Sequence, residues 1–231
     1  PMLVLVHGGP FGVQEKWGYD EEAQLFASQG YSVLQVNFRG SGGFGRQFLY
    51  SAYGQWGGVM VDDIIDATRW AINYGYADAG RICIMGHSYG GYAAIWSTIK
   101  EPELYRCAIG SMGVYDLPYV FEEKNITGST QLIKYFQDSL GTEVDKLRKN
   151  SPVFNVDKIK VPILLSHGTK DDISPFEQAT RFRKALDKEH VGYEWIELKG
   201  TGHFYSKKEH RKEFYSKVLA FLDKHTREKT N

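Results

Sequence analysis

Cysteine is scarce in this chain of 231 residues, which contains only two. Two cysteines are too few for a disulfide framework, and Cys83 and Cys107 both lie in apolar, strand-like runs. This pattern predicts reduced thiols in the core. An excess of positive charge is also missing, because 28 Lys and Arg residues balance 28 Asp and Glu residues. Nucleic acid is therefore not an expected partner, since its phosphates require basic residues to neutralise them.

Long apolar runs are absent as well. No segment approaches the roughly 20 apolar residues that a bilayer-spanning helix needs, so no membrane partner is expected. The first residues, 1–6, contain neither a charged leader nor a small-residue cleavage site. Because residues 3–6 already have the character of a core strand, we expect a domain cut out of a longer polypeptide. The cytoplasm is the expected location.

What the chain has is 42% apolar and 14% aromatic residues, enough to bury a sizeable core. Short apolar runs alternate with helical patterns, and several runs are apolar at consecutive positions. Consecutive apolar residues are typical of parallel strands whose two faces are covered by helices. The predicted strands are residues 3–6, 32–36, 81–85, 107–111, 161–166 and 194–198, and the predicted helices are residues 21–29, 59–74, 89–100, 131–140, 176–188 and 207–224.

This alternation predicts an α/β fold, with a mostly parallel, doubly wound sheet and helices on both faces, in one domain over residues 1–231. In open sheets of this kind, sites lie beyond the carboxyl ends of the strands. A polar or glycine-rich loop follows each of the six predicted strands. We therefore expect a functional site at this edge of the sheet.

Residues 86–91 (GHSYGG) have the Gly-x-Ser-x-Gly spacing of a nucleophile elbow. The pentapeptide alone is weak evidence for a nucleophile elbow, because an ordinary Gly-Ser turn can match it. Here it stands between an apolar strand and a helical run, which is the context that the chemistry requires. A tight strand-to-helix turn exposes the serine hydroxyl, and the N-terminus of the following helix favours developing negative charge. Ser88 is the candidate nucleophile.

A serine nucleophile needs a base, and His203, in the loop after the last predicted strand, is the candidate. An acid must then hold the imidazole in the correct tautomer. Position alone does not separate Asp171 from Asp172, which both follow the fifth predicted strand. Asp116, after the fourth, is the next alternative.

Two backbone donors should stabilise the oxyanion. One is expected to be the N–H of Tyr89, which follows the nucleophile. The other should come from residues 7–10 (HGGP), where Pro10 has no N–H to donate. This leaves Gly8 and Gly9, of which Gly9 is favoured.

Histidines of three loops, His7, His87 and His167, are an alternative site for a metal ion. No carboxylates at a ligand-like spacing accompany them, so we expect no metal and no other cofactor. Bracing of the loops by hydrogen bonds is the interpretation that we prefer for all three.

Together, these motifs resemble the catalytic domain of the prolyl oligopeptidase family of serine peptidases, and most of all its acylaminoacyl-peptidase branch. The resemblance implies the α/β-hydrolase fold and hydrolysis of short or N-acylated peptides through an acyl-enzyme. It covers nearly the whole chain, in order, and rests on residues 7–10 (HGGP), 37–41 (NFRGS), 86–91 (GHSYGG), 167–171 (HGTKD) and 202–203 (GH).

The resemblance also carries residue roles. The family places its acid four residues after the histidine of the 167–171 loop, which assigns the role to Asp171, and its glycine loop supplies a backbone donor, consistent with Gly9. The family's specificity pocket surrounds the segment after the fourth strand. Aromatic residues of that segment are the candidate substrate contacts, with burial in helices as the alternative: Tyr115, Tyr119, Phe121, Tyr135 and Phe136.

Two departures from the family concern the size of the chain. Members usually carry an N-terminal β-propeller, and the first strands of the hydrolase sheet also have no counterpart here. Both departures fit a C-terminal fragment of a longer chain. Two other functions stay open: a carboxylesterase that uses the same triad, and a catalytically silent binding protein with the hydrolase fold. Neither the residues nor the resemblance predicts an oligomeric state.

Overall fold

A computed structural model of the chain describes residues 1–205 and 207–227. Its centre is a sheet of six strands in the order β2-β1-β3-β4-β5-β6, and all neighbouring strands are parallel. All six correspond to predicted strands. Their bounds are β1 (Met2–Val6), β2 (Ser32–Gln35), β3 (Ile82–His87), β4 (Cys107–Ser111), β5 (Ile163–Gly168) and β6 (Tyr193–Leu198).

The six longest helices also correspond to predicted ones. They are α1 (Glu21–Ser28), α3 (Val59–Asn73), α4 (Tyr89–Lys100), α6 (Thr130–Leu140), α8 (Phe176–Lys188) and α9 (Lys208–Thr226). Shorter helical segments lie between them, mostly between β4 and β5: α2 (Arg46–Tyr50), α5 (Lys124–Thr127), α7 (Val144–Lys149), and the 3-10 segments η1 (Pro118–Glu122), η2 (Pro152–Phe154) and η3 (Val156–Lys158).

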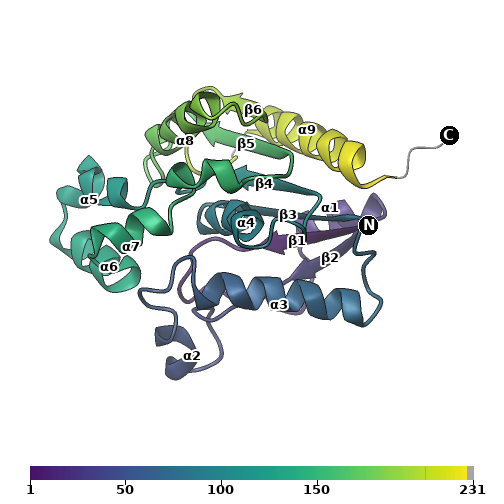
Figure 1. Ribbon diagram of the computed structural model, residues 1–231, viewed down its shortest axis with the longest axis horizontal. Coiled ribbons are helices and arrows are strands. Elements are labelled where there is room, and N and C mark those ends of the chain that lie inside the picture. The colour runs from purple at the N-terminus through teal and green to yellow at the C-terminus, as the bar shows by residue number, and fades with distance from the viewer. Residues whose placement is uncertain (206, 228–231) are drawn as a thin grey trace.

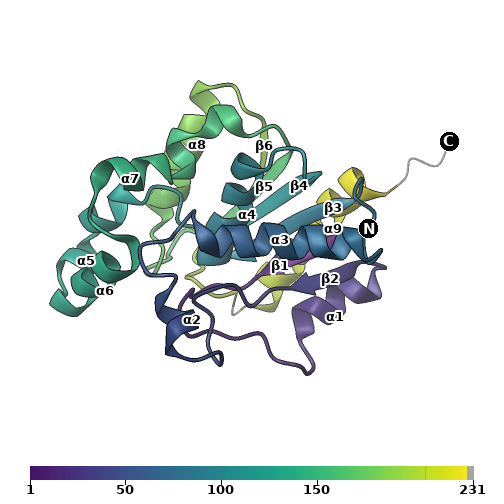
Figure 2. The same cartoon turned by 60° about the horizontal axis from the view of Figure 1, so that its bottom comes forward.

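Helices cover both faces of the sheet (Figures 1 and 2). Met2, Val4 and Val6 of β1 pack into one core cluster, together with residues of α3, α4 and α8. Leu3 and Leu5 pack into the cluster on the opposite face, with residues of α1 and α9. Because side chains alternate along a strand, a consecutive apolar run supplies two cores at once. The predicted doubly wound parallel sheet is confirmed.

The prediction for the two cysteines is wrong. Cys83 of β3 and Cys107 of β4 are register partners, with their Cα atoms 4.8 Å apart, and they form a disulfide. The apolar surroundings were predicted correctly, since both side chains are fully buried. The pairing of β3 with β4 was needed to place the two sulfur atoms within bonding distance.

Helix α9 is the longest helix, and it is amphipathic rather than apolar throughout. Only one of its faces contributes to the core, through Phe214, Val218, Phe221 and Leu222. Within residues 1–205 and 207–227, no helix combines the length and the apolar character needed to cross a bilayer.

Candidate active site

Ser88 lies in the turn between β3 and α4, with backbone angles φ 56° and ψ −121°. A positive φ is costly for a residue with a side chain and persists where surrounding contacts hold it. Here the Ser88 N–H donates to the Ser111 carbonyl at 2.9 Å, and the Ser88 carbonyl accepts from the Tyr92 N–H at 3.1 Å. These two bonds fix the turn between the sheet and the first turn of α4.

The glycines around Ser88 allow a very close approach of backbones. A Cβ atom at Gly90 would lie 2.1 Å from the carbonyl oxygen of Val6 in β1, and one at Gly86 would lie 2.4 Å from the Gly90 carbonyl carbon. Neither distance is possible for real atoms, so only glycine fits. The chain thus has the strand, strained turn and helix that a nucleophile elbow requires.

His203 and Asp171 are joined by a hydrogen bond, with 2.8 Å between His203 Nδ1 and Asp171 Oδ2. The other carboxylate oxygen of Asp171 accepts the backbone N–H groups of Ile173 at 3.0 Å and Ser174 at 2.9 Å. Burial alone would raise the pKa of Asp171, but hydrogen bonds from His167 and His203 outweigh it and hold that pKa well below its usual range. Asp171 is therefore a buried carboxylate whose charge faces the His203 ring.

The two alternative acids lie elsewhere. The Asp116 carboxylate accepts from Arg181 Nε at 2.7 Å and from the Tyr119 N–H at 3.2 Å. Asp172 is exposed, next to the buried Asp171. Position in the sequence left Asp171 and Asp172 equivalent, whereas in the structure the carboxylate that accepts the hydrogen bond of His203 belongs to Asp171.

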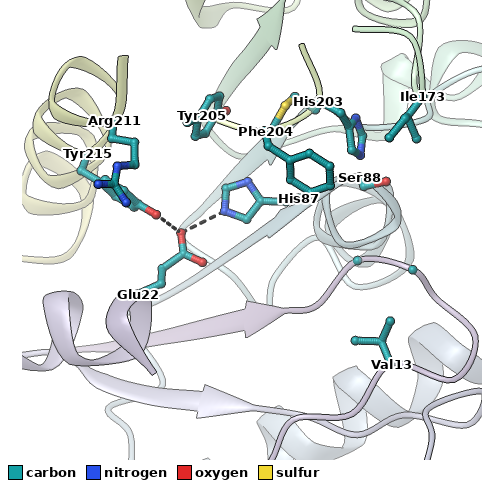
Figure 3. A pocket seen from close by; sticks show the side chains of 13 residues that line it. Val13, Glu22, His87, Ser88, Ile173, His203, Phe204, Tyr205, Arg211 and Tyr215 are labelled. Atoms are coloured by element: carbon teal, nitrogen blue, oxygen red, sulfur yellow. Dashed lines mark hydrogen bonds and ion pairs between the residues drawn. The ribbon is translucent and has the colours of Figure 1, made fainter. Parts of the chain in front are cut away.

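Ser88 and His203 line the same cavity, which has a volume of about 620 Å³ (Figure 3). Gly8 and Gly9 of the loop after β1 line it as well. Segments far apart in the sequence therefore meet at the carboxyl edge of the sheet, as expected for a parallel α/β fold.

The predicted oxyanion donors belong to two backbone segments around this cavity. Tyr89 is the first residue of α4, so its N–H has no partner within the helix. Gly9 has a φ of 119°, a conformation that favours glycine, and a Cβ there would lie 2.8 Å from the Val13 side chain. Backbone N–H groups at the start of a helix also suit an anion.

The loop histidines each have a separate partner. His7 Nε2 lies 2.9 Å from Ser41 Oγ. His167 Nε2 lies 2.7 Å from the Ser174 carbonyl oxygen and 3.3 Å from Asp171 Oδ2. His87 Nε2 lies 2.9 Å from Glu22 Oε1. In the part of the chain that the structure describes, no group of three or more His, Cys, Asp or Glu side chains is arranged to hold a metal ion.

The aromatic residues predicted to contact substrate do not line the cavity beside Ser88. Tyr115 is buried and stacks on Phe182, with ring centroids 4.6 Å apart, and the Arg181 guanidinium lies 4.5 Å from the Tyr119 ring centroid. Tyr135 and Phe136 of α6 pack edge to face on each other. Phe121 packs against the core as a partly buried residue. Their role in substrate binding stays a prediction.

The sequence analysis missed four residues with polar side chains that line the cavity: Glu22, Tyr205, Arg211 and Tyr215. Glu22 belongs to α1, and Arg211 and Tyr215 belong to α9. The spacing of Arg211 and Tyr215, four residues apart in a predicted helix that closely follows His203, places both on one face. That spacing is the feature of the sequence from which Arg211 and Tyr215 could have been predicted.

Residues 17–229 match the sequence family described as the prolyl oligopeptidase family. This chain belongs to that family. Solved structures agree, because a puromycin-hydrolyzing peptidase of Mycobacterium tuberculosis matches 98% of the chain with a TM-score of 0.90 and 29% identity. An acylaminoacyl peptidase of Pyrococcus horikoshii matches 100% of it, with a TM-score of 0.89 and 26% identity. The predicted family and the α/β-hydrolase fold are confirmed.

Members of the prolyl oligopeptidase family that match this chain are much longer. Dipeptidyl aminopeptidase BIII of Pseudoxanthomonas mexicana is 33% identical over 227 residues, which are 96% of this chain and 33% of the relative. The two structural relatives are covered over 34% and 38% of their chains. The chain thus spans about a third of the length of these relatives.

Proposed function

We propose that the protein is a serine peptidase that hydrolyses short or N-acylated peptides. One observation carries the proposal: a serine in a strained turn shares a cavity with a histidine whose other ring nitrogen is hydrogen-bonded to a buried carboxylate. This arrangement is the one that activates a serine hydroxyl. Relatives named as aminopeptidase and acylaminoacyl peptidase support peptide substrates.

In the proposed mechanism, Ser88 Oγ attacks the carbonyl carbon of the scissile bond while His203 Nε2 takes its proton. Asp171 keeps the proton of His203 on Nδ1 and stabilises the imidazolium that forms. The N–H groups of Tyr89 and Gly9 donate to the oxyanion of the tetrahedral intermediate. His203 then protonates the leaving amine, and water hydrolyses the acyl-enzyme with the same histidine as base.

We propose further that residues 1–231 form the α/β-hydrolase catalytic domain of a longer protein. The relatives support this reading, since the matched part is about a third of their length. The substrate and gating of the whole protein then depend on the remaining part as well.

Labelling with a fluorophosphonate followed by peptide mapping tests the proposal. We expect the label on Ser88, together with hydrolysis of N-acyl-aminoacyl or dipeptidyl anilides by the full-length protein. Turnover of p-nitrophenyl esters with negligible amide cleavage would favour a carboxylesterase. Folded protein in which Ser88 stays unlabelled would overturn the proposal and favour a silent binding protein.

The two neighbouring aspartates provide a matched pair of variants. Asp171→Asn should lower kcat by about 10³- to 10⁴-fold, because the amide no longer stabilises the imidazolium and favours the wrong tautomer. Asp172→Asn, at an exposed position, should stay within about threefold of the unmodified enzyme. Steady-state kinetics on one anilide substrate measures both. Equal losses in the two variants would contradict the assignment of Asp171.

For the compartment, we propose an oxidising one in place of the cytoplasm expected from the sequence. Disulfides persist mainly in oxidising compartments, and Cys83 is bonded to Cys107. Alkylation of protein denatured without reductant should then leave both cysteines unmodified. Two alkylated thiols in the protein as isolated would restore the cytoplasmic assignment.

A further inference from the structure

The cavity beside Ser88 also reaches residues that the mechanism does not use. Glu22 of α1 and Tyr215 of α9 line it together with His87 (Figure 3). Glu22 Oε1 lies 2.9 Å from His87 Nε2 and accepts a hydrogen bond from the Tyr215 hydroxyl at 3.0 Å. These contacts make the cluster part of a built wall of the cavity, with side chains from three different elements.

The charges of this wall do not cancel. The Glu22 carboxylate outweighs burial and raises the pKa of His87, and His87 in turn lowers the pKa of Glu22 against the effect of burial. These shifts favour the charged forms of both side chains, which pair with each other without net charge. Arg211, one turn before Tyr215 in α9, also lines the cavity, and its guanidinium has no ion pair with any residue among 1–205 and 207–227. The Arg211 guanidinium therefore leaves this wall of the cavity with one unpaired positive charge.

The chemistry decides which part of a substrate faces this wall. His203 must protonate the leaving amine, so the leaving group lies on the His203 side of the scissile bond. The cavity that His203 lines is also lined by residues that follow it in the chain, namely Phe204, Tyr205, Arg211 and Tyr215. Its volume, about 620 Å³, is in the range that holds a ligand the size of a short peptide.

We propose that Arg211 binds the C-terminal carboxylate of the leaving peptide. The inference rests on the proposed peptidase function and specifies its substrates as short peptides with a free carboxyl end. A guanidinium pairs with a carboxylate through two parallel hydrogen bonds. The Glu22 carboxylate is instead hydrogen-bonded to His87 and Tyr215, and among the described residues it forms no ion pair with Arg211.

The test compares an N-acetylated alanine tripeptide with a free carboxylate and the same peptide ending in a carboxamide. The full-length protein should cleave the carboxylate with a kcat/KM about 10-fold higher, which corresponds to one charge-assisted hydrogen bond. In Arg211→Gln the ratio should fall to about one, with the loss mainly in KM, and Arg211→Lys should restore part of it.

Lys212→Gln is the matched control, since Lys212 follows Arg211 in α9 and lines a neighbouring hollow but not the cavity of Ser88. It should keep the 10-fold ratio. A ratio near one in the unmodified protein, an unchanged ratio in Arg211→Gln, or an equal loss in Lys212→Gln would overturn the proposal. Fluorophosphonate labelling of Ser88 in the same samples tests the peptidase function separately, so the two failures are distinguishable.

Discussion

Replacing Ser88 with alanine is expected to lower kcat for peptide hydrolysis by about 10⁶-fold. The hydroxyl oxygen is the atom that would form the acyl-enzyme, and without it His203 and Asp171 have no nucleophile to activate. The residual rate should come from the oxyanion donors and from substrate binding alone. Alanine and serine tolerate the positive φ at this position about equally, so the fold should stay intact.

Single-turnover kinetics with an anilide substrate, together with a thermal melt, measures both effects of Ser88→Ala. Ser97→Ala is the matched control, because Ser97 is a buried serine of α4, the helix that follows Ser88, and its hydroxyl donates to the Ala93 carbonyl at 2.7 Å. Its kcat should change by less than about threefold. A Ser88→Ala variant with ordinary activity would show that another residue performs the chemistry.

Gly90→Ala is expected to destabilise the protein by about 3 kcal/mol or more, at the upper end of what an added methyl group costs in a packed interior. The new Cβ would lie 2.1 Å from the carbonyl oxygen of Val6 and 2.9 Å from its carbonyl carbon. These are backbone atoms of β1, which is paired on both sides, so they cannot move away as a flexible side chain would. Either α4 lifts off the sheet or the elbow is distorted.

Urea denaturation of the Gly90→Ala variant measures this loss, and activity should fall with it. Gly192→Ala is the control, because no atom lies within 4 Å of a Cβ there and its backbone is not in the positive-φ region. Its free energy of unfolding should change by less than about 0.5 kcal/mol or rise slightly. Equal stability of the two variants would contradict the close approach of α4 to β1.

Long elements with a clear pattern were predicted well because each carries its own signal. All six strands are present, although β5 begins at Ile163, immediately after Pro162, whose nitrogen has no hydrogen to donate to the ladder. Helix α3 was evident from Ile64, Ile65 and Thr68, which are buried on one face. Short helices such as α5 and α7 were missed, since one or two turns contain too few residues to establish a period.

Some residues of the candidate site were likewise predicted from the sequence, and others were not. Ser88 and His203 were predicted as site residues because their loops follow predicted strands, and parallel strands bring such loops to one edge, where both line one cavity. The choice of Asp171 over Asp172 came from the family resemblance alone, and the hydrogen bond to His203 now supports it. Glu22 was not predicted, because nothing near it in the chain distinguishes it from an ordinary surface residue of a helix.

The sequence by itself was sufficient to predict the succession of strands and helices along the chain, the elbow around Ser88 and the balance of charge. The first two depend on residues close together in the chain, and the third depends on composition alone. The bond between Cys83 and Cys107, the pairing of Glu22 with His87 and the position of Arg211 at the cavity depend on which elements become neighbours. Distances of a few ångströms decide such contacts, and they exist only once the sheet and its helices have packed.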